Sequence, residues 1–484
     1  MKVQPLMKVG LVSLLFFSAM VGLNPSHAQT QEELLSLIQQ QAALIEGLQK
    51  RLDVLENQSQ QNAATVHAVA QQAENAEQKA AKAEEKVATA GDSKFKWGPS
   101  PTVKSADGNF SAHVRGRLLI DYGKVKDASE VGSQNRSATE FRAARLGLEG
   151  TAWQDVKYKF EVDFANNEVE IKDAYAEYAG LSNFKIRVGQ FKEAVSLEEE
   201  GSTRHISLME RGNFTDAFGF ARRLGVKVLT GGDIWTASAA VFGGSISENA
   251  DDEGYALTGR VAVFPKIGNG GQLHFGASVR HRGFGNDYDE MEKRYRQRPQ
   301  AHVSGVRYVD TGTLEGLNSD TNFGVEAAGI FGPFWVESEW AWLSANVADD
   351  YVSDYNGQNS AKFQGGFIGA GWFITGESRG YKKGKFDRPK VNNPVMDGGM
   401  GAWSVVARYD YLDLVDEGAD IFGGKQKTWI LGVNWYLNRH TVVKVNYAHA
   451  NISESFAGAY EKAYVDEDGK NSVNSFTARV QVDW

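Results

Sequence analysis

The chain has 484 residues, of which 42% are hydrophobic and 23% are charged, and its formal net charge is −9. Its mean hydropathy of −0.40 excludes a bundle of membrane-spanning helices, and its acidic balance excludes a broad nucleic-acid-binding surface. There is no cysteine, which excludes a disulfide framework, a thiolate nucleophile and a cysteine-based metal site.

The first 28 residues have the form of a secretory signal peptide. Lys2 and Lys8 precede an apolar run over residues 9–23, and Ser26 and Ala28 are small residues at the two positions that a signal peptidase reads. We therefore predict that residues 1–28 are a signal peptide, cleaved after Ala28. A retained anchor is the less favoured alternative, because the run is too short for a comfortable transmembrane helix.

Residues 29–90 carry a heptad repeat, with no proline and only one glycine between Gln31 and Ala90. The repeat predicts a long α-helical coiled coil of about eight heptads, which we expect in the periplasm. Gln41 and Asn62 are polar seam positions that set the register, and the number of strands stays open. A single solvated helix is the alternative. The firmest seam residues are Ile38, Ile45, Leu48, Leu52 and Leu55.

Residues 91–109 contain two prolines and are predicted to be a linker, after which the hydrophobic period changes to two. Alternation of apolar and polar side chains predicts strands with one wet face, as in a barrel around an aqueous lumen. A soluble sandwich is the alternative. The alternating segments cover residues 112–122, 157–164, 184–190, 429–437, 443–447 and 476–484.

Two details favour a membrane barrel over a sandwich. Aromatic residues such as Tyr122, Phe164 and Trp429 lie at the ends of apolar faces, where interfacial girdles belong. The last strand ends on an aromatic, Trp484, a feature that resembles the C-terminal signature of bacterial outer-membrane barrels. We predict an all-β transmembrane barrel over residues 110–484 with about 16 antiparallel strands, although 14 or 18 would also fit its length.

Most of the charges predicted to face the lumen are basic, which favours entry of anions by the field that they create. The alternative is that these charges pair across the barrel wall. The nine basic residues assigned to the lumen are Arg115, Arg117, Arg145, Lys157, Lys159, Lys185, Arg187, Lys444 and Arg479, and the five acidic ones are Asp121, Glu149, Glu161, Asp163 and Asp483.

Two segments between strand patterns are too long and too charged to be simple turns, and we expect them to narrow the lumen. Their arginines suit phosphate or carboxylate ligands, because a guanidinium group binds two oxygens at once and stays charged. Residues 192–225 carry Arg204 and Arg211 beside Glu198, Glu199 and Glu200, and residues 291–308 carry Arg296 and Arg298.

These residues together resemble the phosphate-selective porins, a family of trimeric, sixteen-stranded outer-membrane channels. The resemblance covers most of the chain after Asn109, and the coiled coil is an addition to the family pattern. Its most specific stretches are Gly116-Arg117-Leu118, Phe141-Arg142, Asp155-Val156-Lys157-Tyr158, Val188-Gly189-Gln190-Phe191, Leu208-Met209-Glu210-Arg211, Ile374-Thr375-Gly376-Glu377, Gly401-Ala402-Trp403 and Leu431-Gly432-Val433-Asn434-Trp435-Tyr436.

In that family a ladder of basic side chains leads to a narrow eyelet that holds phosphate. The resemblance places Arg117, Arg142, Lys157, Asp173, Arg296 and Arg298 on matching positions. It also shows departures, since Ala143, Gln300 and Ser304 stand where further arginines are expected and Glu199 stands at the eyelet lysine. A carboxylate at a poorly hydrated constriction should repel phosphate, so the resemblance implies the fold but not phosphate specificity.

We therefore expect an outer-membrane porin for the passive diffusion of small hydrophilic solutes, with a preference for inorganic or organic anions. The resemblance implies a homotrimer. A general or cation-preferring porin governed by Glu198–Glu200 is the first alternative. The second is an envelope-spacing protein that contacts peptidoglycan through residues 29–90 while the barrel sits in outer-membrane lipid. We expect no enzyme, no cofactor and no metal site, and the nine histidines show no H-x-x-x-H spacing.

Overall fold

The computed structural model describes residues 31–89, 93–128, 136–243, 254–268, 270–285, 291–456 and 465–484. The chain divides into two compact units, Met1–Ala90 and Gly91–Trp484. The predicted signal peptide lies outside the described residues. The placement of the two units relative to one another is not determined, so each is described by itself.

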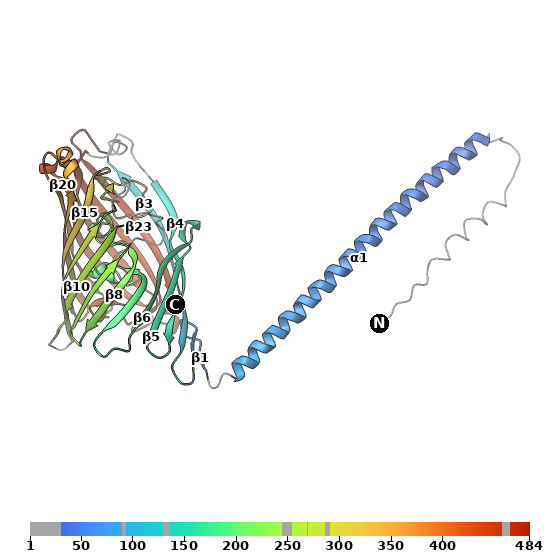
Figure 1. The fold of residues 1–484 in the computed structure, drawn as a ribbon, viewed down its shortest axis with the longest axis horizontal. Helices are drawn as coiled ribbons and strands as arrows, with labels where there is room; N and C mark the ends of the chain where they lie inside the picture. The colour runs from blue at the N-terminus through green and yellow to red at the C-terminus, as the bar shows by residue number, and fades with distance from the viewer. Residues whose placement is uncertain are drawn as a thin grey trace. The chain divides into compact units, whose positions relative to one another are not determined.

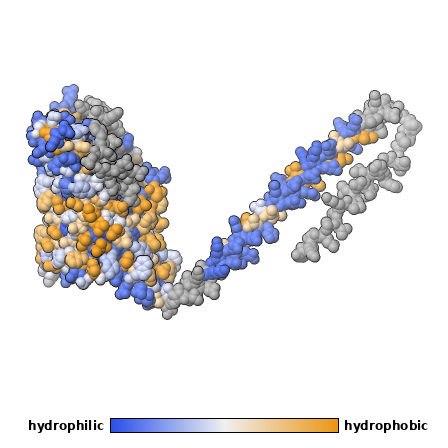
Figure 2. Space-filling view, in the orientation of Figure 1, coloured by the Kyte–Doolittle hydropathy of each residue, from blue (hydrophilic) through white to orange (hydrophobic). Residues whose placement is uncertain are grey.

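The first unit contains one helix, α1 (Gln31–Thr89), of 59 residues. Its many alanine, glutamine, glutamate and lysine residues are good helix formers, so the helix runs without a break. At 1.5 Å per residue it is about 88 Å long. The predicted seam residues Ile38, Ile45, Leu48, Leu52 and Leu55 are each more than half exposed, and apolar side chains are visible along the helix in Figure 2. The long helix is confirmed, and its pairing with further copies stays a prediction.

No helix among the described residues combines the length and the apolar character that a membrane crossing requires.

The second unit is a closed antiparallel barrel (Figure 1), and sixteen strands form its wall in the described part of the chain. Each strand pairs with the next, and β23 closes the barrel by pairing with β3. The predicted fold class and strand number are confirmed. The wall strands are β3 (Ser111–Asp127), β4 (Arg136–Ala152), β5 (Val156–Asp163), β6 (Glu170–Tyr178), β7 (Lys185–Lys192), β8 (Arg222–Gly231), β9 (Trp235–Phe242), β10 (Tyr255–Val263), β12 (Gly271–Gly283), β15 (Leu317–Phe331), β16 (Phe334–Val347), β17 (Ser360–Phe373), β20 (Ala402–Asp416), β21 (Ile421–Tyr436), β22 (Thr441–Ser455) and β23 (Asn471–Asp483).

Side chains alternate between the two faces of the wall. In β23, Phe476, Val480 and Val482 are 37–45% exposed on the outer face, whereas Arg479 and Gln481 are buried on the inner face. On the side in view in Figure 2, the outer faces of the strands form an apolar band, as a wall that faces lipid requires. The terminal strand therefore has the orientation that its alternation predicted.

The wall is not equally high all around. Strands β5 to β10 have 8–10 residues each, whereas the other wall strands have 13–17. Most connections at the end where β3 begins are short turns, and in outer-membrane barrels that end is periplasmic. Longer connections lie at the opposite, extracellular end.

Two short strands, β1 (Lys94–Lys96) and β2 (Thr102–Lys104), lie within residues 91–109, which the sequence analysis assigned to a linker. They form a hairpin that pairs with β3. Two further short hairpins lie in connections between wall strands, β13 (Arg296–Gln297) with β14 (Val309–Asp310), and β18 (Gly380–Lys382) with β19 (Lys385–Asp387). Strand β11 (Lys266–Ile267) extends the turn before β12.

Candidate pore constriction

The connection between β7 and β8, residues 193–221, crosses the lumen, and we call it the constriction loop. It contains two short helices, α2 (Leu197–Glu200) and α3 (Asn213–Ala217). Lys444 of β22 donates to the carbonyl of Ile206 at 2.6 Å, and Arg479 of β23 donates to that of Met209 at 2.7 Å. Because β22 and β23 do not neighbour β7 and β8 in the sheet, the loop reaches a remote wall.

Wall carboxylates hold the constriction loop by accepting hydrogen bonds from its backbone. Glu339 of β16 accepts from the amides of Leu197 and Glu198 at 2.8 and 2.9 Å. Asp410 of β20 accepts from the amide of Asn213 at 3.1 Å. Each contact satisfies a buried backbone amide that would otherwise lack an acceptor, so together they hold the loop against the wall.

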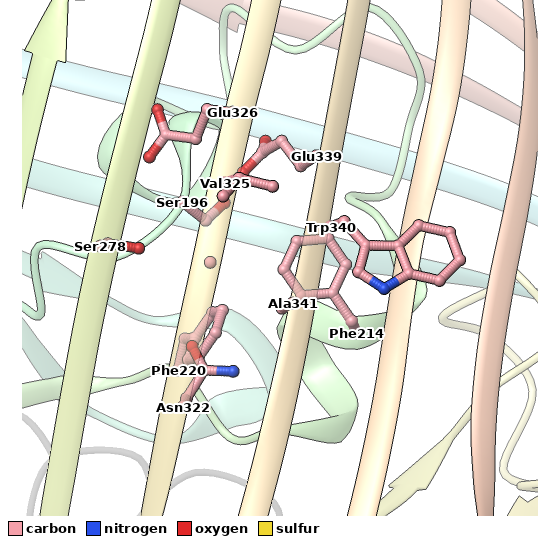
Figure 3. Close-up of a pocket in the computed structure, with 11 residues that line it drawn as sticks. Ser196, Phe214, Phe220, Ser278, Asn322, Val325, Glu326, Glu339, Trp340 and Ala341 are labelled. Atoms are coloured by element: carbon pink, nitrogen blue, oxygen red, sulfur yellow. The ribbon is translucent and has the colours of Figure 1, made fainter.

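A small cavity remains between the constriction loop and the strands β12, β15 and β16. Figure 3 shows Ser196 and Phe214 of the loop on one side and Glu339 and Trp340 of the wall on the other. The side-chain oxygens of Ser278 and Asn322, which line it, have no hydrogen-bond partner within the described residues. The cavity has room for little more than water, so the loop and wall are close to fully packed here.

The connection between β12 and β15 contains residues 291–308, the second segment predicted to narrow the lumen, and this segment packs against the constriction loop. Gln297 donates to the carbonyl of Asn213 at 3.0 Å, and Gln300 donates to that of Arg211 at 3.0 Å. The hydroxyl of Tyr308 donates to Asp127 of β3 at 2.9 Å. The two segments that were predicted to narrow the lumen therefore build one assembly.

A third segment enters from the periplasmic end and was not predicted. Residues 374–401 join β17 to β20 and contain the hairpin β18–β19. Arg379 donates to the carbonyl of His205 at 3.0 Å, and Lys385 lies 3.7 Å from Glu200. Burial and the nearby guanidinium groups, that of Arg204 above all, lower the pKa of His205 to about 2. That imidazole is therefore neutral where the loop and the hairpin meet.

An open cavity of about 850 Å³ lies where the constriction loop, residues 291–308 and the wall strands β3, β4 and β23 meet. Five arginines and three carboxylates line it, together with neutral side chains that include Leu119, Ala143, Met209 and Gln300. We call this cavity the eyelet. Its charged lining consists of Arg142, Arg145, Arg211, Arg298, Arg479, Glu199, Glu210 and Asp216.

Each carboxylate of the eyelet lies within ion-pair distance of an arginine. Glu210 lies 3.2 Å from Arg142 and 3.0 Å from Arg479, and Asp216 lies 3.6 Å from Arg298. Burial opposes ionisation of Glu210, but the two guanidinium groups outweigh it and lower its pKa to about 2. The carboxylates of the lining are thus compensated. The lining holds more arginines than carboxylates, but Arg145 and Arg479 also pair with Asp163 and Asp121 of the wall, so Arg142, Arg211 and Arg298 are the arginines without a wall partner of this kind among the described residues.

The acidic run in α2 does not present three free carboxylates to the pore. Glu198 faces the wall, accepts from the Gly212 amide at 2.8 Å and pairs with Arg408. Glu199 lines the eyelet but lies 3.3 Å from Lys192 and 3.1 Å from Arg211. Glu200 points to Lys227 and Lys385, each 3.7 Å away. The carboxylate expected to repel phosphate therefore carries two basic partners, which the sequence pattern did not reveal.

Of the residues predicted to line the pore, Arg142, Arg145, Arg211 and Arg298 line the eyelet together with Glu199. Several others form ion pairs along the inner wall instead. Arg115 pairs with Glu149 and Glu161, Arg117 with Glu161, Asp173 with Lys159 and Arg222, and Arg187 with Glu177. The alternative weighed from the sequence, pairing across the wall, thus holds over β3 to β7.

The remaining predicted residues lie apart from the eyelet. Lys157 is exposed near the periplasmic end of β5. Arg204 lies 3.7 Å from Asp483 at the end of β23. Arg296 is half-buried on β13.

Sequence reasoning missed the acidic anchors Glu339 and Asp410 and their basic neighbour Arg408. A signal was present, because charged residues on the inner faces of β16 and β20 alternate with apolar outward residues as they do in β3. The sequence also contains a G-x-S-x-G motif at residues 376–380. The nucleophile elbow that this motif marks in hydrolases joins a strand to a helix, whereas here it lies in the connection before the β18–β19 hairpin.

Comparison with known proteins gives the family. Residues 113–484 match the phosphate-selective porin O and P family. An uncharacterised protein of Caulobacter vibrioides is 33% identical over 401 residues, which cover 80% of this chain and 76% of that protein. Porin O of Pseudomonas aeruginosa is 26% identical over 415 residues, which cover 78% of this chain and 90% of that protein.

Solved structures agree in fold. An anion-selective porin from Comamonas acidovorans superposes with a TM-score of 0.50 at 14% identity, over 78% of this chain and 100% of that chain. A family match over most of the barrel, the sixteen-stranded wall and the loops that narrow its lumen lead to one conclusion. The chain belongs to the phosphate-selective porin O and P family and is an outer-membrane porin, a channel and not an enzyme.

Proposed function

We propose that this porin conducts small hydrophilic solutes with a preference for anions. The observation that carries the proposal is the charge of the eyelet, where five arginines stand against three carboxylates. An excess of positive charge at a constriction raises the local concentration of anions and lowers that of cations. The description of the matched family as phosphate-selective and the name of one similar solved structure, an anion-selective porin, point the same way.

The preference should be general for anions and not specific for phosphate. Arg142 and Arg298 are the most exposed arginines of the eyelet, yet Arg142 already donates to Glu210, and Arg298 donates to the Ser304 carbonyl and lies within ion-pair distance of Asp216. Neutral Ala143 and Gln300 line the same cavity, so they add no donor as strong as an arginine. An inorganic anion would therefore meet a mild positive field instead of a closed cage of guanidinium groups.

A cation-preferring channel governed by Glu198–Glu200 has less support. Glu198 is only 1% exposed and faces Arg408, so an ion in the lumen does not meet it. Glu199 and Glu200 each lie between two basic groups. A carboxylate flanked in this way attracts cations weakly, because its field is largely cancelled at the distance of a hydrated ion.

The test is the zero-current potential of the purified full chain in a planar bilayer under a KCl gradient, comparing wild type with Arg142→Gln. A single charge about 6 Å from the ion path changes the energy of each ion by about 0.5 kcal/mol after screening, and hence the chloride-to-potassium ratio by about fivefold. The matched control is Arg439→Gln, an exposed arginine in a periplasmic turn, which should leave the potential unchanged.

An anion-selective potential that falls in Arg142→Gln and persists in Arg439→Gln supports the proposal. A cation-selective wild type overturns the anion preference. If wild type is anion-selective but Arg142→Gln matches it, the eyelet is not the source of the preference. Addition of phosphate then separates general from specific binding, because only a specific site lets millimolar phosphate block the chloride current.

We also propose that α1 extends into the periplasm and pairs with the same helix of other copies in a homotrimer. The support is its exposed apolar seam, which leaves side chains such as Leu48, 57% exposed, in water in a single copy. Because the chain has no cysteine, Leu48→Cys introduces a unique thiol at a seam position, and Lys50→Cys introduces one on the outer face. Cross-linking of the first but not the second supports a parallel coil, and equal cross-linking argues against it.

A contact of α1 with peptidoglycan is the second candidate role, favoured only by its length of about 88 Å. Deletion of residues 31–89 should weaken retention of the barrel by isolated cell-wall sacculi if this contact exists. The conductance of the shortened channel should match wild type in either case, because the barrel forms a separate compact unit.

A further inference from the structure

The β1–β2 hairpin extends the barrel wall at the periplasmic end. Thr102 pairs with His113, Val103 with Ala112 and Lys104 with Ser111 of β3. Strand β23 stops pairing with β3 at Arg117, so the hairpin takes over the edge of β3 just beyond the end of β23. Figure 1 shows β1 at this end of the barrel, projecting past the neighbouring turns.

The register gives the hairpin two different faces. His113 contacts Glu149 on the inner side of the wall. Thr102 pairs with His113 and therefore lies on this inner side, as does Lys104, two residues further along β2. In β1, Lys96 pairs with Thr102 and Lys94 pairs with Lys104, so all three lysines lie on the inner side. Residues that pair directly across antiparallel strands point to the same side. The opposite side therefore carries Phe95 and Val103.

The outer side of the hairpin is apolar and uncovered. Phe95 is 52% exposed, Trp97 is 81% exposed and Val103 is 45% exposed, and the rings of Phe95 and Trp97 stand edge to face with centroids 5.2 Å apart. Phe110, 45% exposed, accepts a backbone hydrogen bond from Ser105, just after β2, and its ring lies 6.1 Å from that of Trp153, 71% exposed. We call these five residues the aromatic patch.

The aromatic patch continues the surface that faces lipid. Phe110 comes just before β3, and Val114 lies further along the same outer face, which belongs to the apolar band of the barrel. A cluster of tryptophan and phenylalanine with lysines close by is the composition of the membrane–water interface, where aromatic rings sit at the level of the headgroups. A patch of this kind is costly in water unless something covers it.

We propose that the β1–β2 hairpin is a membrane-contacting tab, whose aromatic patch lies in the headgroup region of the periplasmic leaflet. Its lysine side stays in water on the other face. The lipid contact of this porin thus extends past the barrel, onto the segment that joins the wall to α1. This inference does not depend on ion selectivity, because the patch lies outside the lumen.

Nitroxide spin labels on single cysteines test the proposal in the full chain, since no native cysteine interferes. The label is placed at Trp97→Cys and at Val103→Cys on the patch, and at Lys96→Cys on the opposite face of the same hairpin as the matched control. Relaxation of the spin label by oxygen indicates that the label lies in lipid, and relaxation by a charged nickel chelate indicates that it lies in water. Trp97→Cys removes one ring of the aromatic patch and could itself weaken the contact with lipid. Val103→Cys keeps both aromatic rings of the hairpin and therefore tests the intact patch.

In liposomes of phosphatidylethanolamine and phosphatidylglycerol, we expect the oxygen-to-nickel accessibility ratio to be several-fold higher at positions 97 and 103 than at 96. Equal ratios at all three positions would overturn the proposal, because the patch would then be in water. A second copy could instead pair with the open edge of β1. In that case the labels at 97 and 103 would stay immobilised and show spin–spin broadening in detergent as well as in liposomes, which also overturns it.

Discussion

Glu198→Gln should release the constriction loop without opening the barrel. The Glu198 carboxylate and Arg408 guanidinium are each 1% exposed and pair with one another. Within the described residues, the Nε and one terminal nitrogen of Arg408 have no hydrogen-bond partner, and its guanidinium lies 3.9 Å from the ring of Phe367. Removing the carboxylate leaves this buried cation without its ion-pair partner, which costs about 3–5 kcal/mol.

This cost falls on the docking of the loop, because a displaced loop lets water reach Arg408. If local opening becomes easier by 3–5 kcal/mol, amide exchange over residues 197–213 should accelerate by about a hundred-fold to several thousand-fold, at 1.4 kcal/mol for each factor of ten. Hydrogen exchange with mass spectrometry on the full chain in detergent measures this directly. Amides of the wall strands should not change, and open-channel current noise should rise.

Asp216→Asn is the matched control within the same loop. Asp216 is 54% exposed and lies 3.6 Å from Arg298, which is itself 22% exposed, so its replacement should cost no more than about 1 kcal/mol and raise exchange less than tenfold. If both variants exchange alike over residues 197–213, the Glu198–Arg408 pair does not hold the loop, and the reasoning from buried charge fails.

Two further predictions concern the eyelet and barrel closure. Because its neighbours lower the pKa of Glu210 below the value of a free glutamate, its charge persists as the medium is acidified. Glu210→Gln removes this charge and should make the channel more anion-selective than wild type. The difference between the two zero-current potentials should stay the same from pH 7 to pH 4 and vanish only toward pH 2. A difference that vanishes by pH 4 contradicts this. A Cβ on Gly116 would lie 2.1 Å from Cζ2 of Trp484, whereas one on Gly259 would lie 3.6 Å from its nearest neighbour. Gly116→Ala should therefore destabilise the barrel by about 1–3 kcal/mol relative to Gly259→Ala. The measurement is the urea concentration at which half of the folded electrophoretic band is lost, which should be lower for Gly116→Ala. Equal midpoints for the two variants would count against this prediction.

The wall of the barrel could be predicted from the sequence because its signal is local. Alternation in residues 112–122 and 476–484 depends only on neighbours two positions apart, and the structure has β3 and β23 there with the expected inner and outer faces. The heptad repeat of α1 is local in the same sense. The strand number followed from length together with the resemblance.

The constriction could be predicted only in part, because its contacts join residues that are far apart in the chain. Glu198 and Arg408 are 210 positions apart, and their contact exists only once the barrel has closed and the loop has folded inward. The arginines of the eyelet could be named, but not which carboxylate each one meets. The β1–β2 hairpin was missed because strands of three residues are too short to show a period.

Three segments that fold inward build the pore of this barrel. As a result, different parts of the chain set the width of the barrel and the narrowness of the passage inside it. The wall fixes the width of the barrel through its backbone ladder, and residues 193–221, 291–316 and 374–401 narrow the passage inside it. A loop of different length or charge can replace one of these segments while every strand keeps its partner. Relatives of this porin can thus diverge in what they transport through substitution of loops alone, and likeness in the strands is a poor guide to likeness of cargo.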